Sequence, residues 1–307
     1  MPELSNIKSG DPGRVPAPPA TDSAGLSPAP STRSFRGPWE GPRTPRDGRD
    51  HSGTLPSAGY NRAVTTDLTY LVLDIETIPD RELWDPPEPA GVPGASDRPF
   101  PPLYACRPVV LGVMWLDASL AVKRIGTIGE TKDEAGMMTD FADFMAKWRP
   151  QVITWNGRGF DLPVLALRAL RFGLDFRWYY RGEGYRYRFS EEGHLDLCDV
   201  ISDHGAAKMT SLDGAARTIG LPGKDGVDGS QVEVLFHAGQ IEALRQYCLS
   251  DVAQTAFLFL RYRLVAGDLD RDGYRHAASG LLAALESDGR FGKLLDGVDR
   301  KRLLLGD

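Results

Sequence analysis

The stretch YLVLDIETIP (residues 70–79) places two acids inside an otherwise apolar run. Its aliphatic residues, such as Leu71 and Ile75, are typical of a buried strand. Asp74 and Glu76 are costly there, because an ionised carboxylate that is buried without a partner loses its hydration. Residues two apart in a strand point to the same face, so both acids face one side of the predicted sheet. The segment therefore predicts a strand whose end is either solvated or the wall of a charged site.

The rest of the chain alternates between strand and helix patterns. Residues 108–116 and 121–128 predict a hairpin, and residues 151–156 predict a short buried strand. Helices are predicted for residues 133–148, 161–173, 210–220, 240–264 and 271–289. This order predicts an α/β fold with a mixed sheet flanked by helices.

Residues 1–66 differ in composition from the rest of the chain. They are rich in Pro, Gly, Ser and Arg and lack hydrophobic periodicity. Such a segment cannot bury enough apolar surface to offset the entropy of ordering. We therefore expect a disordered tail, either without function or touching nucleic acid or a partner through its arginines. The expected organisation continues with one domain over residues 67–265 and a C-terminal helical extension over residues 266–307.

Charge and cysteine content narrow the class of protein. A net charge of −6 argues against broad coating of nucleic acid, although an enzyme with a local basic channel is compatible with it. Cys106, Cys198 and Cys248 form no CxxC motif, so we expect reduced packing residues and a cytoplasmic location. No stretch approaches the ~20 apolar residues of a membrane helix, so no membrane partner is expected.

Two further segments carry acids at telling positions. WNGRGFD puts Asn156 and Asp161 at the junction of a predicted strand and the next helix, where Asp161 also suits a helix N-cap. In the helix over residues 240–264, Asp251 lies one turn after Tyr247 on a mostly apolar face. An aspartate on an inward face needs a partner, either a cation such as Arg217 or a metal ion. The nearby pair His194 and Asp196 is interpreted as structural.

Acids that converge from these segments would repel one another and raise their own pKa values. Divalent cations remove that conflict, and carboxylate oxygens suit Mg²⁺ or Mn²⁺ better than softer metals. Two such ions about 3.5–4 Å apart activate a water and stabilise a leaving oxygen in phosphodiester cleavage. The predicted site consists of Asp74, Glu76, Asp161 and Asp251.

The motifs DIET, NGRGFD and YCLSD, in this order, resemble the DEDD superfamily of 3′-to-5′ exonucleases. Tyr247 and Asp251 form the Tyr-x-x-x-Asp pattern of the DEDDy branch. The stretch from SLDGAARTIG through the third motif is similar to the stand-alone family related to the exonuclease domain of family B DNA polymerases. The resemblance covers about residues 67–265.

This resemblance implies a ribonuclease H-like fold, with a mixed five-stranded sheet flanked by helices. It implies hydrolysis of the terminal phosphodiester at the 3′ end of single-stranded nucleic acid, with DNA favoured and nucleoside monophosphates released. The four acids would hold two Mg²⁺ or Mn²⁺ ions, and Tyr247 would orient the attacking water. Two alternatives stay open: an RNA-trimming exoribonuclease, and a non-catalytic nucleic-acid-binding module on the same fold.

The segment over residues 171–189 interleaves arginines with aromatic residues. That mixture suits single-stranded nucleic acid, because cations meet phosphates and each stacked base contributes ~1–3 kcal/mol. The alternative is a twisted hairpin whose aromatic residues pack on the sheet. The predicted nucleic-acid-binding residues are Asn156, Phe160, Arg177, Trp178, Arg186 and Lys224. For Lys224, on a Gly-rich loop, a plain surface turn is the alternative.

Overall fold

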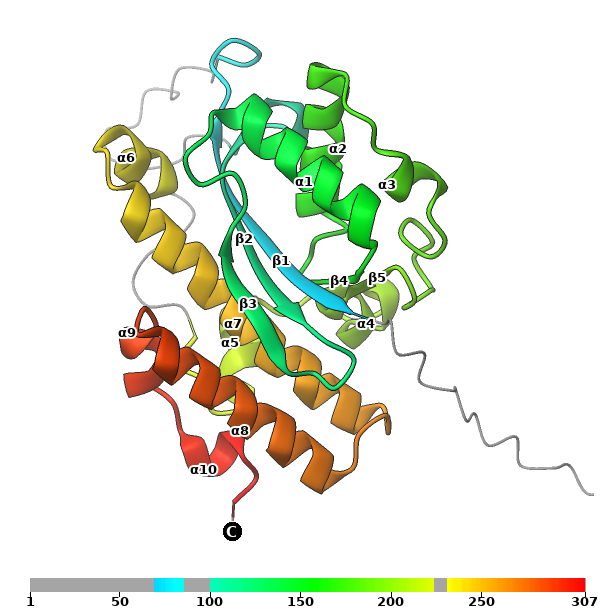
Figure 1. Ribbon diagram of the computed structural model, residues 1–307, viewed down its shortest axis with the longest axis vertical. Helices are drawn as coiled ribbons and strands as arrows, with labels where there is room; N and C mark the ends of the chain where they lie inside the picture. The colour runs from blue at the N-terminus through cyan, green and yellow to red at the C-terminus, as the bar shows by residue number, and fades with distance from the viewer. Residues whose placement is uncertain (1–68, 86–99, 224–230, 307) are drawn as a thin grey trace, which may run out of the picture. The chain divides into compact units, whose positions relative to one another are not determined.

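The computed structural model describes residues 69–85, 100–223 and 231–306 (Figure 1). Within them a five-stranded sheet has the order β3-β2-β1-β4-β5. The strands are β1 (Tyr70–Pro79), β2 (Cys106–Leu116), β3 (Val122–Thr127), β4 (Gln151–Thr154) and β5 (His194–Asp196). The pairs β1–β2 and β2–β3 are antiparallel, and the pairs β1–β4 and β4–β5 are parallel. These directions and this order confirm the predicted mixed sheet of a ribonuclease H-like fold.

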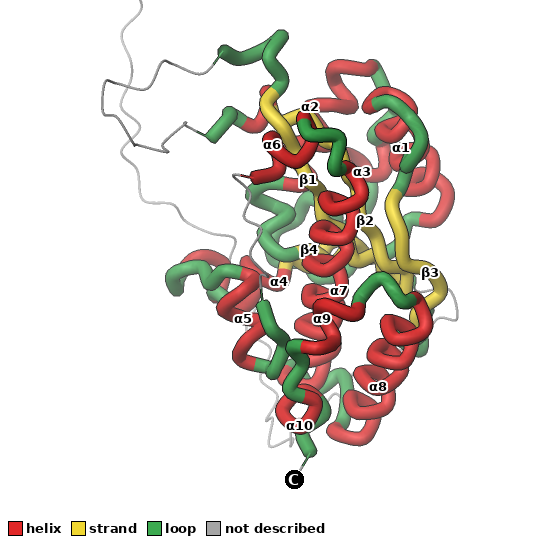
Figure 2. Tube along the Cα trace, turned by 90° about the vertical axis from the view of Figure 1, so that its left-hand side faces the viewer, coloured by secondary structure: helices red, strands yellow, loops and turns green. Residues whose placement is uncertain are grey.

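Helices cover both faces of the sheet, with α1 and α2 on one side and α7 and α8 on the other (Figure 1). Figure 2 shows the same elements from the side, with α8 beside α7. Their bounds are α1 (Glu134–Trp148), α2 (Asp161–Phe172), α3 (Arg177–Arg181), α4 (Leu197–Ile201), α5 (Leu212–Thr218), α6 (Val232–His237), α7 (Ile241–Val265), α8 (Arg271–Asp288), α9 (Gly292–Asp296) and α10 (Arg300–Leu303).

Alternate residues of β1 enter two different cores. Val72 belongs to the core that contains α7 and α8, whereas Leu71 and Leu73 belong to the core that contains α1 and α2. Because strand residues alternate between faces, Asp74 and Glu76 follow Val72 onto the α7 face. The pleat of β1 thus directs both acids toward the long helix that carries the third motif.

Several predicted details are corrected by the structure. Residues 171–189 do not form a hairpin, because Arg177–Arg181 is the short helix α3. The described residues also include β5, α4, α6, α9 and α10, which the sequence patterns did not reveal. All of these elements are short, so they contain too few residues for a periodic pattern to be recognised.

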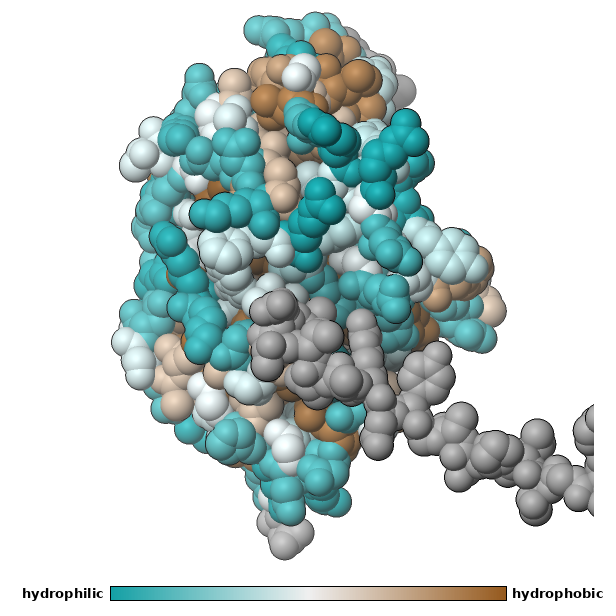
Figure 3. Space-filling view, turned by 45° about the vertical axis from the view of Figure 1, so that its right-hand side comes forward, coloured by the Kyte–Doolittle hydropathy of each residue, from teal (hydrophilic) through white to brown (hydrophobic). Residues whose placement is uncertain are grey.

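The surface in Figure 3 is mostly hydrophilic, with apolar side chains gathered in a few separate patches. In the part of the chain that the structure describes, no helix combines the length and apolarity needed to cross a bilayer. The predicted tail over residues 1–66 lies outside the described residues, so that prediction stays a prediction.

Candidate active site

The first wall of the site is the middle of β1. Glu76 is buried at 7% exposure, and Asp74 is partly exposed. Asp74 pairs across the ladder with Gly112 of β2, and the register shifts just after Glu76. The two carboxylates therefore lie just before an irregularity in the ladder, and Asp74 lines a cleft.

The second wall is the loop between β4 and α2, which is folded around the carboxylate of Asp196. The backbone N–H groups of Asn156 and Arg158 donate to the two oxygens of Asp196, each at 2.8 Å. Asn156 adopts a left-handed backbone with φ 64°, a conformation that asparagine tolerates better than most residues. Asp196, interpreted from the sequence as structural, is thus the residue that shapes the second motif.

Asp161 follows this loop as the first residue of α2, and it is buried at 4% exposure. The N-cap position belongs to Phe160, so the predicted capping role of Asp161 is wrong. Its carboxylate instead accepts a hydrogen bond from the backbone N–H of Ile75. Because Ile75 stands between Asp74 and Glu76, this bond joins the second motif to the first.

The third wall is α7, which presents Tyr247, Cys248 and Asp251 on consecutive turns. Asp251 is buried at 6% exposure. The predicted alternative partner, Arg217, instead pairs with Asp213 on its own helix at 3.0 Å. Asp251 lies close enough to Asp74 for its charge to raise the pKa of that carboxyl, so it belongs to the same site as the acids of β1.

Electrostatics show that the acids share one site. Burial raises the pKa of Asp74 well above its usual range, and the charges of Asp161, Glu76 and Asp251 raise it further. Burial likewise raises the pKa of Asp161 to about 7, with Asp196 adding to the effect. Residues far apart in the chain thus form one cluster of carboxylates: Asp74, Glu76, Asp161 and Asp251.

This cluster fits divalent cations. Its donors are carboxylate oxygens, the ligand type that Mg²⁺ and Mn²⁺ prefer. The raised pKa of Asp74 has desolvation and repulsion as its causes, and a bound cation relieves both. The donor oxygens of Asp74 and Glu76 also lie within 4.8 Å of each other and of the Cys248 sulfur.

Tyr247 stands beside the cluster as a neutral phenol. Burial raises its pKa above the usual value of 10, and the charges of Asp251, Glu76 and Asp74 act in the same direction. A phenol that stays protonated at neutral pH acts through its hydrogen bonds and not as an anion. This agrees with the orienting role that the sequence motif implies for Tyr247.

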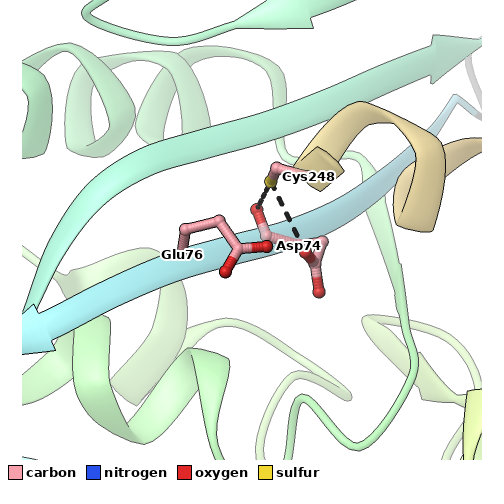
Figure 4. A group of neighbouring side chains, drawn as sticks. All are labelled: Asp74, Glu76 and Cys248. Carbon is pink, nitrogen blue, oxygen red and sulfur yellow. Dashed lines mark hydrogen bonds between the residues drawn. The ribbon is translucent and has the colours of Figure 1, made fainter. Parts of the chain in front are cut away.

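Cys248 is a site residue that the sequence analysis treated as packing. All three cysteines are free and buried, but Cys248 lies against Asp74 (Figure 4). Its Sγ is 3.4 Å from Asp74 Oδ2 and 3.4 Å from the Asp74 carbonyl oxygen. The sequence offered one sign of this role: Cys248 lies between Tyr247 and Asp251 in the third motif.

Three clefts lie at the acids or next to them, and acids of the cluster line two of the three. The first, about 390 Å³, is lined by Asp74, Asn156 and Asp251 among others. It shares Asn156 and Met209 with a second cleft of about 450 Å³, where Arg158, Tyr179, Arg186 and Arg188 also stand. The third, about 200 Å³, is lined by Tyr247, Asp251, Arg290 and Lys293 among others. Asp251 lines both the first cleft and the third, so the acidic site is reached from two clefts.

The predicted nucleic-acid-binding residues separate into two groups. Asn156 lines the first cleft and Arg186 lines the second. Arg186 is exposed, and its guanidinium lies 5.0 Å from the ring centre of Tyr180. Both residues are therefore open to a strand that approaches the acids.

The remaining candidates lie elsewhere. Trp178 is buried at 1% exposure among aromatic rings, so it has no face for a base and its prediction is wrong. Arg177 pairs with Asp175 and lines a different cleft beside the C-terminal end of α2. Phe160 is partly buried, with its ring 5.7 Å from that of Phe100. Lys224 lies outside the described residues.

The five-stranded mixed sheet and the acids gathered at one site are what the sequence motifs predicted for a nuclease of the exonuclease type. A family model described as a predicted 3′-5′ exonuclease related to the exonuclease domain of PolB matches residues 98–295. The chain belongs to this family, as the sequence resemblance indicated. The matched residues contain the second and third motifs, and the first motif precedes them.

Individual proteins show more distant similarity. The catalytic chain of DNA polymerase epsilon from Schizosaccharomyces pombe is 26% identical over 135 residues, which are 42% of this chain and 6% of that protein. A product-bound structure of exonuclease I is 16% identical with a TM-score of 0.36, over 65% of this chain and 44% of that one. Escherichia coli exonuclease I with a dT13 oligonucleotide is 12% identical with a TM-score of 0.32, over 61% and 43%. This chain therefore spans less than half the length of each.

Proposed function

We propose that this protein is a metal-dependent 3′-to-5′ exonuclease that removes nucleoside monophosphates from single-stranded nucleic acid, with DNA favoured. The observation that carries the proposal is the convergence of Asp74 with Asp161, Glu76 and Asp251, whose charges raise its pKa. Membership of an exonuclease family supports the reaction class. The similarity to a DNA polymerase favours DNA over RNA.

The acids would hold two Mg²⁺ or Mn²⁺ ions. When bound, such ions supply an activated water and stabilise the leaving oxygen of the phosphodiester. The chain's own contribution is to hold Asp74 and Glu76 on a rigid strand and Asp251 on a long helix. Sites on rigid elements keep their geometry better than sites on loops.

Tyr247 would orient the attacking water. Its neutral phenol both donates and accepts a hydrogen bond, so it fixes a water without removing the proton itself. Its place on the cleft that contains Arg290 and Lys293 puts it at the edge of the acidic cluster.

The strand would approach through the cleft that contains Arg186. The acids alone repel phosphates, and this cleft brings Arg158, Arg186 and Arg188 toward them with Tyr179 alongside. Arg188 pairs with Asp199 and Arg158 donates to the His194 carbonyl oxygen at 2.8 Å, so both are fixed in place. Arg186, packed on tyrosine rings, is the more adaptable phosphate contact.

The test is a panel of matched DNA and RNA oligonucleotides, single- and double-stranded, labelled at either end. With Mg²⁺ or Mn²⁺ we expect loss of 3′-terminal nucleotides from single-stranded DNA, and EDTA or a blocked 3′ end should stop it. Faster loss from RNA would identify an exoribonuclease. Binding of the single strand without shortening would instead identify a nucleic-acid-binding module and overturn the proposal.

A further inference from the structure

Cys248 lies where α7 crosses β1 and β2, and its side chain is fully buried. Its Sγ is 3.4 Å from both Asp74 Oδ2 and the Asp74 carbonyl oxygen (Figure 4). At these distances the thiol is the donor, and an Asp74 oxygen accepts the hydrogen bond.

Gly112 makes room for this contact. It is the partner of Asp74 across the β1–β2 ladder, so a side chain there would project onto the α7 face. A Cβ at residue 112 would lie 2.7 Å from Cys248 Sγ and 3.3 Å from Val252 Cγ2. A glycine inside a strand often marks such a close approach. The Cys248 thiol therefore occupies space that is open only because residue 112 has no side chain.

We infer that Cys248 is a positioning residue for Asp74, and that Gly112 is required because it lets α7 bring the thiol to that carboxylate. The inference rests on the proposed function and deepens it. A donor on Oδ2 restrains rotation of the carboxylate and leaves the second oxygen to face the cation site. Residues of this kind, which touch a ligand and not the metal, typically tune metal affinity.

A competing role is that Cys248 is itself a metal ligand, since its sulfur lies within 4.8 Å of the Asp74 and Glu76 donor oxygens. A ligating thiol must lose its proton, whereas a positioning thiol must keep it. A simpler competing role is that the side chain only fills space. Serine separates these roles, because it keeps a donor of similar size but is a poor soft-metal ligand.

The test uses the full-length protein with Mn²⁺ as the probe and no nucleic acid. Free Mn²⁺ is followed by electron paramagnetic resonance, and turnover of a 3′-labelled single strand is measured in parallel. Removing the donor with Cys248→Ala should weaken Mn²⁺ binding about tenfold, the low end for such partners because a thiol is a weak donor. Cys248→Ser should bind Mn²⁺ within a factor of about three of the wild type, since its hydroxyl replaces the lost hydrogen bond.

Gly112→Ala should also weaken Mn²⁺ binding, because the added methyl group displaces the thiol. The matched control is Gly126→Ala in β3, where a Cβ meets nothing within 4 Å. Cys106→Ser controls for loss of a buried cysteine away from the acids. Circular dichroism checks that each variant is folded, and Cys248→Ser keeps the test informative if Cys248→Ala unfolds.

Three results would overturn the inference. The first is wild-type Mn²⁺ affinity in Cys248→Ala, and the second is equal weakening in Cys248→Ser and Cys248→Ala. The third is a cadmium–thiolate charge-transfer band in the wild type that Cys248→Ala abolishes, which would make the thiol a ligand. Asp74→Asn separates the two proposals: if it too binds Mn²⁺ normally, the proposed metal site itself fails.

Discussion

The strand β1 has acids in two settings that behave in opposite ways, one in its middle and one just past its end. Asp80, just past its end, accepts hydrogen bonds from Arg168 at 2.8 Å and Arg171 at 3.1 Å. Burial alone would raise the pKa of Asp80, but these arginines outweigh it and hold the pKa below its usual range. At Asp74, burial and the other carboxylates all act upward. Arginines hold the pKa down at Asp80, whereas burial and like charges hold it up at Asp74.

The difference separates a structural cluster from a functional one. Arg168, buried at 1% exposure, also donates to Glu134 of α1, so it ties β1, α1 and α2 together. A buried ion pair of this kind contributes little net stability, but removing one partner is strongly destabilising because the other charge is left buried. Around Asp74, burial and the neighbouring carboxylates raise the pKa, so ionising Asp74 opposes folding. This difference supports the proposal that the acids around Asp74 bind divalent cations.

The largest effect on turnover is expected for Asp74→Asn, which tests whether the acids around Asp74 are functional. We expect turnover to fall by about a thousandfold or more, because a metal ligand worth several kcal/mol of barrier is lost. The free energy of unfolding in EDTA should not fall, since repulsion among the acids is relieved. Single-turnover assays and urea unfolding measure the two effects. Asp117→Asn, which removes an acid paired with Lys123 at 2.8 Å, is the control and should keep turnover.

The opposite pattern is expected for Arg168→Met. Removing the buried cation leaves Asp80 paired only with Arg171 and Glu134 only with Arg107, so the free energy of unfolding should fall by about 3–5 kcal/mol. Turnover per folded molecule should stay near normal at temperatures where the variant is folded. A loss of turnover without a loss of stability would show that the two clusters are not separate.

The two clusters also differ in their response to pH. Asp161 has a folded pKa of about 7 against 3.8 for the unfolded chain, so the folded state binds the extra proton between these values. Its contribution to stability is therefore lost as pH rises, by on the order of 2–4 kcal/mol between pH 5 and 8. Buried neutral His194, whose pKa is lowered, acts in the opposite direction.

For that reason the quantity to measure is the difference in unfolding free energy between wild type and Asp161→Asn, in EDTA, at several pH values. The wild type should lose stability relative to the variant as pH rises, and Mn²⁺ should cancel the loss. A difference that does not change between pH 5 and 8 would mean that Asp161 has an ordinary pKa.

The smallest expected effect concerns the approach to the acids. Arg186→Ala should weaken binding of single-stranded DNA by about 1 kcal/mol and lower the salt dependence by roughly one phosphate contact. Arg177→Ala is the matched control, because Arg177 pairs with Asp175 and lines a different cleft. Equal losses in both variants would indicate diffuse attraction and not a defined path. Fluorescence anisotropy at several salt concentrations measures this.

The local part of the account was predictable from the sequence. The acids of β1 interrupt a strong strand pattern, and Asp251 interrupts a strong helix pattern, so each is visible within a few residues. Helices with full periodicity, such as α1, α2, α7 and α8, lie within a few residues of their predicted bounds.

The remainder depends on contacts between distant segments. Trp178 stands among arginines and tyrosines in the sequence, but the rings of Phe141 and Tyr185 enclose it. Gly112 and Cys248 each have an ordinary local setting, and their importance appears only when α7 crosses β2. The burial of Asp80 by Arg168 is equally invisible from either residue alone.

The most direct test of the central claim is a crystal structure grown with Mn²⁺, with anomalous diffraction recorded at the manganese edge. If the four acids hold two metal ions, two anomalous peaks should appear about 3.5–4 Å apart, surrounded by carboxylate oxygens of Asp74, Glu76, Asp161 and Asp251. A cleft without an anomalous peak, or one in which Asp161 or Asp251 turns away from Asp74, would contradict it.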